Sequence, residues 1–192
     1  MNESIQGAFV FQPKPGLYKN IVVFDFRSLY PTIITAHNLG PEGFRCNCCR
    51  EQGKVPEKDE YWFCVREKKF LPMVLDDIIT VRAKLKKEIK ELEELKKEKR
   101  EIAILESRSY ALKILANAFY GYLGFFGARW YCKEAAASTT AYARYYIKET
   151  IETARRRGFE VIYADTDSCF LLLGEQKMED ALRFMEDVNM QL

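Results

Sequence analysis

Two short apolar runs that each end in aspartate constrain the fold of this chain more than any other feature. Ile21–Phe24 leads directly into Asp25, and a second run leads into Asp165 and Asp167, about 140 residues further along the sequence. Both runs are rich in β-branched and aromatic residues, which favour strands. We expect a buried strand over Ile21–Phe24 and a β-hairpin over Phe159–Leu173 whose turn carries the two later acids.

Acids at the ends of strands also suggest a chemistry. A carboxylate beside a buried strand costs free energy unless it is paired or bound to a metal. Clustered carboxylates with no histidine or cysteine among them suit a hard cation such as Mg²⁺. Two such ions about 4 Å apart can stabilise the attacking and the leaving oxygens of a phosphoryl transfer. The alternative, that these acids only accept hydrogen bonds from turn N–H groups, stays open from the residues alone.

Apolar residues at helical spacing predict two long helices in the middle of the chain. Ile78 begins a stripe with steps of three or four residues, and Val81–Arg100 surrounds that stripe with nine basic and five acidic residues. Ser107 is a candidate N-cap for a second helix that continues to Tyr122, which would complete an antiparallel hairpin. Taken alone, the first helix is equally typical of a solvated helix or of half a coiled coil.

The remaining sequence completes a mixed pattern of helices and strands. A third helix is predicted over Lys133–Arg157, because Gly158 is placed to stop it. A last amphipathic helix is predicted over Met178–Leu192. Pro41–Glu60 is polar and contains glycine and proline, which indicates a loop or a small subdomain.

Composition excludes some classes of protein. With 192 residues, of which 48% are hydrophobic and 14% aromatic, the chain fits one domain, or one domain with a small inserted one, and is not disordered. No apolar run approaches the roughly 20 residues of a membrane span, and Met1–Gly16 lacks the pattern of a secretory signal. A net charge of +2 says little about nucleic acid.

Four of the six cysteines lie close together in the sequence, at positions 46, 48, 49 and 64. A zinc site is one interpretation, although C-x-C-C followed by one distant cysteine is not a good ligand spacing. A disulfide from one of the first three to Cys64 is favoured over zinc if the chain comes from a thermophile. Reduced thiols in a loop are a third interpretation, and the sequence does not decide among them.

Polar residues on the predicted hairpin point to a second set of functional side chains. Arg82 and Lys86 are four residues apart and share one helix face. The second helix carries Lys113, Asn117, Tyr120 and Gly121 along one face. Three cations could neutralise a triphosphate, and a tyrosine beside a glycine offers a surface for a stacked base. Each of these residues is also compatible with an ordinary exposed helix position.

Three motifs in this chain resemble those of family B DNA polymerases. Asp25–Pro31 reads DFRSLYP, as in motif A, and Lys113–Gly121 reads KILANAFYG, which is similar to motif B. Tyr163–Ser168 reads YADTDS, as in motif C. The motifs occur in the family's order, and Gly127–Cys132 and Pro13–Tyr18 look archaeal. The resemblance covers essentially the whole chain.

The resemblance implies an α+β fold. It consists of a polymerase palm, an antiparallel sheet backed by helices, with an inserted antiparallel two-helix fingers hairpin. Residues 1–75 would form the first part of the palm with motif A, and residues 76–125 the fingers with motif B. Residues 126–192 would form the second part of the palm with motif C, before a thumb. The resemblance also implies localisation in the cytoplasm of an archaeal or other prokaryotic cell.

The resemblance further implies a role for each matching residue. Asp25 and Asp167 would hold two Mg²⁺ ions with the carbonyl of Phe26, and Asp165 would lie close to the metals and the primer end. The backbone N–H groups of Ser28 and Leu29 would bind the triphosphate of the incoming dNTP. Arg82, Lys86 and Lys113 would bind the phosphates, and Asn117 would support them. Tyr30 would exclude a 2′-OH. Tyr120 and Gly121 would line the nascent base pair.

The expected partners are primer–template DNA and dNTPs. The resemblance begins just before motif A and stops one helix after motif C, so no exonuclease or thumb region is matched. One alternative is therefore a fragment or split subunit that acts only after assembly with those parts. A metal-dependent nuclease that uses the same acids is a weaker alternative, because it would leave the helical cations and Tyr30 without a purpose.

Overall fold

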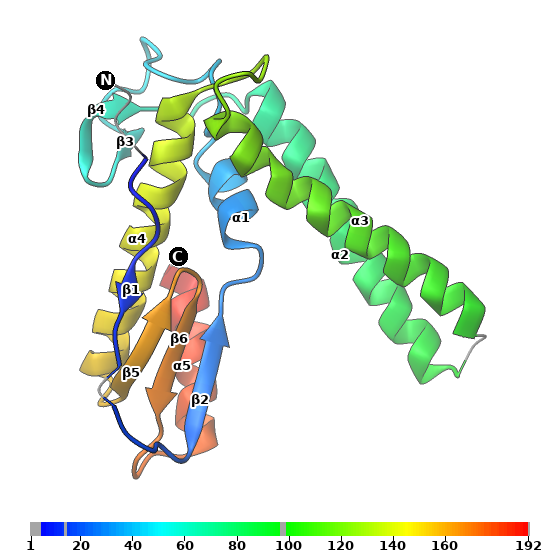
Figure 1. Cartoon of the computed structure of the whole chain (residues 1–192), viewed down its shortest axis with the longest axis vertical. Helices are drawn as coiled ribbons and strands as arrows, with labels where there is room; N and C mark the ends of the chain where they lie inside the picture. The colour runs from blue at the N-terminus through cyan, green and yellow to red at the C-terminus, as the bar shows by residue number, and fades with distance from the viewer. Residues whose placement is uncertain (1–4, 14, 97–98, 192) are drawn as a thin grey trace. The chain divides into compact units, whose positions relative to one another are not determined.

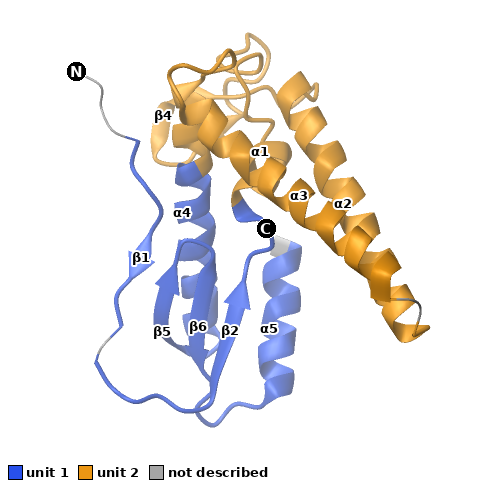
Figure 2. Cartoon of the chain, turned by 45° about the vertical axis from the view of Figure 1, so that its right-hand side comes forward, with its two compact units in different colours: residues 1–29, 140–192 blue, residues 30–139 orange. Residues whose placement is uncertain are grey.

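A computed structural model describes residues 5–13, 15–96 and 99–191. The chain divides into two compact units, one formed by residues 1–29 and 140–192 and the other by residues 30–139 (Figure 2). The described strands are β1 (Val10–Phe11), β2 (Ile21–Asp25), β3 (Lys54–Val55), β4 (Lys58–Trp62), β5 (Glu160–Asp165) and β6 (Ser168–Leu172). The described helices are α1 (Leu29–Ala36), α2 (Phe70–Glu94), α3 (Lys99–Gly124), α4 (Lys133–Arg156) and α5 (Met178–Gln191).

An antiparallel sheet in the order β1-β5-β6-β2 forms the centre of the first unit (Figure 1). β5 and β6 form the predicted hairpin around Asp165–Ser168, and β2 forms where the sequence predicts a strand. The α+β class and the antiparallel sheet are therefore confirmed. The prediction that Ile21–Phe24 is buried is wrong, because Ile21 is 40% and Val23 51% exposed. Val22 and Phe24 pack against the core, so Ile21 and Val23, which alternate with them along β2, lie on the opposite face of the antiparallel sheet.

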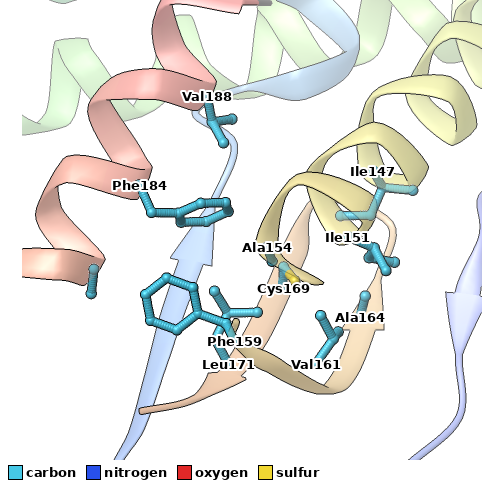
Figure 3. Packing of buried hydrophobic residues seen from close by; sticks show 11 residues of the cluster. Ile147, Ile151, Ala154, Phe159, Val161, Ala164, Cys169, Leu171, Phe184 and Val188 are labelled. Atoms are coloured by element: carbon cyan, nitrogen blue, oxygen red, sulfur yellow. The ribbon is translucent and has the colours of Figure 1, made fainter. Parts of the chain in front are cut away.

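The core of the first unit lies between the sheet and two helices. Side chains from the later part of α4 and from α5 pack against β5 and β6 (Figure 3). Phe184 of α5 is at the centre, with its ring 5.2 Å from that of Phe24 and 5.5 Å from that of Phe159. This apolar cluster holds the strands in register, because a shift of one residue would turn each inward side chain toward solvent.

The predicted helices α4 and α5 are present with the expected ends. α4 stops at Arg156, and Gly158 follows with φ of +82°, a left-handed conformation that glycine adopts without strain. α5 covers Met178–Gln191. The last residue of that prediction, Leu192, lies outside the described residues.

Two long helices, α2 and α3, pack against each other as an antiparallel hairpin in the second unit (Figure 1). The hairpin is as expected, but the predicted start of its second helix is wrong. Ser107 lies inside α3, where its Oγ donates to the carbonyl of Ala103 at 2.8 Å, as serine does in a helix interior. Among the described residues, no helix combines the length and the apolar character needed to cross a membrane.

The segment over Pro41–Glu60, predicted as a loop or small subdomain, contains the short hairpin β3–β4. Gly53 fixes its geometry: its N–H donates to the carbonyl of Cys49, and its carbonyl accepts from the N–H of Phe63. A Cβ there would lie 1.9 Å from the Phe63 oxygen. Buried Asn38 ties the hairpin to the start of α2. Its Nδ2 donates to the carbonyls of Cys64 and Glu67, and its Oδ1 accepts from the N–H of Lys69.

We expect Phe184→Ala to lower the free energy of unfolding by about 3–5 kcal/mol, because it leaves a cavity between Phe24 and Phe159. Met190→Ala is the matched control, since Met190 lies on the same helix with 78% of its surface exposed while Phe184 is 1% exposed. Equilibrium unfolding in denaturant measures both changes. Equal effects of the two substitutions would contradict the assignment of Phe184 to the core.

Candidate active site

The strand pairing of the first unit brings the acidic residues of motifs A and C together. Ser168 of β6 stands opposite Asp25 of β2 on one side and Asp165 of β5 on the other. The N–H of Phe26 donates to the carbonyl of Asp167 at 2.8 Å. Asp25 therefore shares one end of the sheet with Asp165 and Asp167, which lie about 140 residues further along the sequence.

The three carboxylates differ in their hydrogen bonds. Asp165 accepts one from the Tyr163 hydroxyl at 3.1 Å and one from Thr166 Oγ1 at 2.8 Å, so both of its oxygens have donors. In the described part of the chain, no side chain donates a hydrogen bond to Asp25 or Asp167, and the carboxylate of Asp167 is contacted by its own backbone N–H. The lone pairs of these two acids therefore remain available for an external ligand.

Like charges act on Asp167. Partial burial raises the pKa of its carboxyl above the usual value, and the neighbouring charges of Asp25 and Asp165 raise the pKa further. A bound cation would relieve this repulsion. Carboxylate and carbonyl oxygens are the ligands that Mg²⁺ prefers, so the residues present fit that ion. Among the described residues, the carboxylate oxygens of these aspartates lie further apart than the sulfur atoms of a group of four cysteines elsewhere in the chain.

The turn after β2 leads into the start of a helix. Ser28 has φ of +53°, and α1 begins at Leu29. The first N–H groups of a helix have no partner within it and lie at the positive end of its dipole. This turn therefore places potential donors for an anion only three residues after Asp25.

The second unit contains the other candidate residues. The rings of Tyr30, on α1, and Tyr120, on α3, lie 4.6 Å apart and are tilted by 56°. Gly121 has open space where a Cβ would lie. The sequence predicted that both tyrosines and Gly121 lie near the nucleotide, and the structure brings the two tyrosines into contact.

The polar candidates occupy regular helix faces. Arg82 and Lys86 lie one turn apart on α2, and Lys113 and Asn117 lie one turn apart on α3. Arg82 is half-buried and the other three are exposed. Helical geometry thus gives each pair the shared face that the sequence predicted.

Two contributing residues did not emerge from the sequence. Tyr163 and Thr166 hold the carboxylate of Asp165, although sequence reasoning gave neither of them a role. Both lie within the same six-residue motif as Asp165, and hydroxyl groups beside a strand-end acid are a signal that could have identified them.

The family comparison covers the whole chain. The model of DNA polymerase family B matches residues 1–192. The chain is 42% identical to the DNA polymerase of Thermococcus gorgonarius over 195 residues and 40% identical to DNA polymerase 1 of Pyrococcus abyssi over 196 residues. These alignments include 99% and 100% of this chain, and 25% of each relative.

A solved structure is also similar. The family B DNA polymerase from the hyperthermophilic archaeon Pyrobaculum calidifontis matches with a TM-score of 0.73 and 38% sequence identity. The match covers 97% of this chain and 24% of that one. The chain thus spans about a quarter of the length of the proteins that it matches.

We expect Asp167→Asn to raise the free energy of unfolding at neutral pH in Mg²⁺-free buffer. Because the folded-state pKa of Asp167 is raised, its ionised form lowers stability once the pH exceeds that pKa. The advantage of the variant should therefore grow as the pH rises from below the ordinary value of 3.8 to neutral. Denaturant unfolding at a series of pH values measures it.

Asp59→Asn is the control for this prediction, because Asp59 is exposed on β4 in the other unit. Its effect should be small, because an exposed side chain makes few contacts in the folded state. A loss of stability in Asp167→Asn at neutral pH would contradict the repulsion inferred among the three acids.

Proposed function

The chain belongs to DNA polymerase family B, and we propose on that basis that it forms the palm and fingers core of a DNA-directed DNA polymerase. The reaction is the template-directed transfer of a deoxynucleotide to a primer 3′-OH. The observation that carries the proposal is the pairing of β2 with β6, which sets Asp25 and the Asp167 backbone side by side. The proposed division is palm at 1–75 and 126–192 and fingers at 76–125.

Asp25 and Asp167 would hold two Mg²⁺ ions, together with the carbonyl of Phe26. No side chain of the described residues donates a hydrogen bond to their carboxylates, and the burial of Asp167 and its repulsion from Asp25 favour binding of a cation. Bound Mg²⁺ supplies electrostatic stabilisation of the attacking and leaving oxygens of the phosphoryl transfer. The chain's own contribution is to fix both acids on neighbouring strands of a packed sheet.

Asp165 would act beside the metals and the primer end as a helper. Tyr163 and Thr166 already occupy both of its carboxylate oxygens. A carboxylate fixed in this way adds negative charge at the site while keeping a constant position. These contacts support a positioning role for Asp165 more than the role of a principal ligand.

The triphosphate of the dNTP would bind to backbone donors and side-chain cations. Ser28 and Leu29 offer N–H groups at the start of α1, and Arg82, Lys86 and Lys113 offer positive charge, with Asn117 in support. Phosphoryl transfer depends mainly on positioning and charge neutralisation, which these groups are suited to provide.

The sugar and base would meet aromatic and small residues. Tyr30 would exclude the 2′-OH of a ribonucleotide, and its contact with Tyr120 would hold its ring in place. Tyr120 and the uncovered backbone at Gly121 would line the nascent base pair.

The α2–α3 hairpin would serve as the fingers. Its two helices pack on each other and expose most of their outer surfaces. Such a hairpin can move as one body, and closing over a correct nucleotide would assemble the phosphate-binding cations around it.

A second candidate is a non-autonomous part of a polymerase. The chain spans about a quarter of the length of the relatives that it matches, and in this alternative it would act only after assembly with exonuclease and thumb parts. Few phosphate contacts would then be available for duplex DNA. Primer extension at low salt distinguishes the two candidates. It is measured first with the chain alone and then with exonuclease and thumb regions added in trans.

We expect Asp167→Asn to reduce nucleotide incorporation by at least about 100-fold, because replacing even an indirect partner of a metal ligand can cost that much. Extension of a labelled primer with Mg²⁺ and dNTPs measures the loss. If the chain alone is inactive, exonuclease and thumb regions are added in trans. Asp59→Asn should extend the primer like the unaltered chain. Full activity of a folded Asp167→Asn variant would exclude the proposed metal role.

We expect Tyr30→Ala to lower the preference for dNTP over rNTP by about 10- to 100-fold, because the ring no longer meets the 2′-OH. Single-nucleotide incorporation of each substrate gives the ratio of kcat/KM values. Tyr110→Ala is the control, since Tyr110 is an exposed residue of α3. An unchanged ratio in Tyr30→Ala would refute the assignment of this residue to sugar selection.

A further inference from the structure

Four cysteine side chains converge in the second unit, and the proposed polymerase chemistry uses none of them. Cys46, Cys48 and Cys49 lie in the connection after α1, and Cys64 follows β4. All four are free thiols, and their Sγ atoms lie within 4.8 Å of one another. Their spacing in the sequence gave no clear sign of this, because β3 and β4 separate the first three from the fourth.

The separations match those around a tetrahedral metal ion. The Sγ atoms of Cys48 and Cys49 are 3.4 Å apart, and those of Cys48 and Cys64 are 3.9 Å apart. A zinc ion with Zn–S bonds of about 2.3 Å in a tetrahedron places its sulfurs about 3.8 Å from each other. One ion could therefore contact all four sulfurs after only small side-chain movements.

Backbone groups around the cluster support negatively charged sulfur. The N–H of Val65 donates to Cys49, and the N–H groups of Arg66 and Glu67 donate to Cys64. Consecutive N–H groups that face one sulfur form an anion-binding concavity of the kind found at metal–sulfur sites. Such outer contacts orient metal ligands and raise affinity for the metal.

Nearby cations offset part of the charge that four thiolates would carry, because Lys69 and Arg45 also pair with the carboxylates of Glu67 and Glu60. Lys69 lies close enough to Cys64 and Cys48 to interact with them electrostatically. Arg45 and Arg50 both stack on the ring of Trp62, whose Nε1 donates to the carbonyl of Cys46 at 2.8 Å. Four thiolates around a divalent ion leave a net charge of −2, and these side chains lie where they can offset it.

We propose that Cys46, Cys48, Cys49 and Cys64 bind one Zn²⁺ ion in a closed, structural site. All four positions of a tetrahedral ion would be filled by protein, which leaves none for substrate. Four soft thiolates favour zinc or iron over the hard ions expected at the aspartates. The site is therefore separate in chemistry and in residues from the proposed catalytic centre.

The ion would tie together a segment with little apolar core of its own. The hairpin β3–β4 is short; Val55 within it and Phe63 directly after it are buried apolar side chains. Small folded segments of this size generally need a disulfide or a metal. Zinc here would join the connection after α1 to the residues that precede α2.

A disulfide between Cys64 and one of the other three explains the arrangement less well. Such a bond uses two sulfurs and gives no reason for the other two to converge. It also removes the negative charge that the N–H groups of Val65, Arg66 and Glu67 favour.

Metal content tests the proposal directly. The 192-residue chain, reduced, reconstituted with Zn²⁺ and freed of unbound ion, is expected to contain one zinc per chain by mass spectrometry of the elements. Cys48→Ala should lower that content at least about tenfold, because a metal ligand is lost. Cys48 is exposed, so removing its sulfur opens no cavity. Cys132→Ala, which changes a cysteine outside the cluster, should retain the full content.

Two further measurements identify the atoms that bind the metal and test whether the metal stabilises the fold. Co²⁺ in place of zinc should give the absorption bands of a tetrahedral thiolate site in the unaltered chain and not in Cys48→Ala. A chelator should lower the melting temperature of the unaltered chain and of Cys132→Ala, and leave that of Cys48→Ala unchanged. If Cys48→Ala does not fold, protection of the cluster thiols from alkylation by zinc in the unaltered chain decides the question.

Several results would overturn the proposal. Zinc content that is near zero in the folded, reconstituted chain would do so, as would zinc content unchanged by Cys48→Ala. Iron bound in place of zinc would refute the identity of the metal. Alkylation in denaturant without reductant that labels two fewer than the six cysteines would show a disulfide instead.

Discussion

The antiparallel ladder of β5, β6 and β2 is the interaction on which the candidate site depends. It places Ser168 opposite both Asp25 and Asp165, and it joins the Phe26 N–H to the Asp167 carbonyl. A slip of one residue in either pairing would move an acid to the other face of the sheet. The apolar cluster around Phe184 opposes such a slip, so core packing and the position of the acids have the same cause.

The sequence predicts those elements whose side chains follow a simple period. Alternation and β-branched residues located the hairpin and β2, and steps of three or four located the long helices. The sequence-based prediction is wrong where contacts with other parts of the chain determine the position of a residue. Ser107 is a good cap residue that instead bonds to Ala103 inside α3. Ile21 and Val23 are apolar but exposed, because they alternate with Val22 and Phe24, which face the helices of the core.

Contacts between distant residues account for what the sequence could not predict. Asn38 donates hydrogen bonds to the carbonyls of Cys64 and Glu67, which are almost thirty residues away in the sequence. No local sequence pattern predicts that contact. The cysteines form a similar case, because motif spacing describes ligands carried by two regular turns. Here Cys46, Cys48 and Cys49 lie within four residues of one another, and Cys64 follows the hairpin β3–β4. Gly53 allows that hairpin to close.

The two clusters of candidate metal ligands place opposite demands on their surroundings. The aspartates repel one another, and burial adds to the cost of the charge on Asp167, so the sheet and its apolar core must supply the stability that holds them. The cysteines lie in a segment with a small apolar core, where backbone N–H groups lower the pKa of Cys49 and Cys64, while hydrogen bonds with the neighbouring thiols raise that of Cys48. A hard ion at the first cluster would serve chemistry, and a soft ion at the second would serve folding. Ligand softness therefore separates the two roles within one chain.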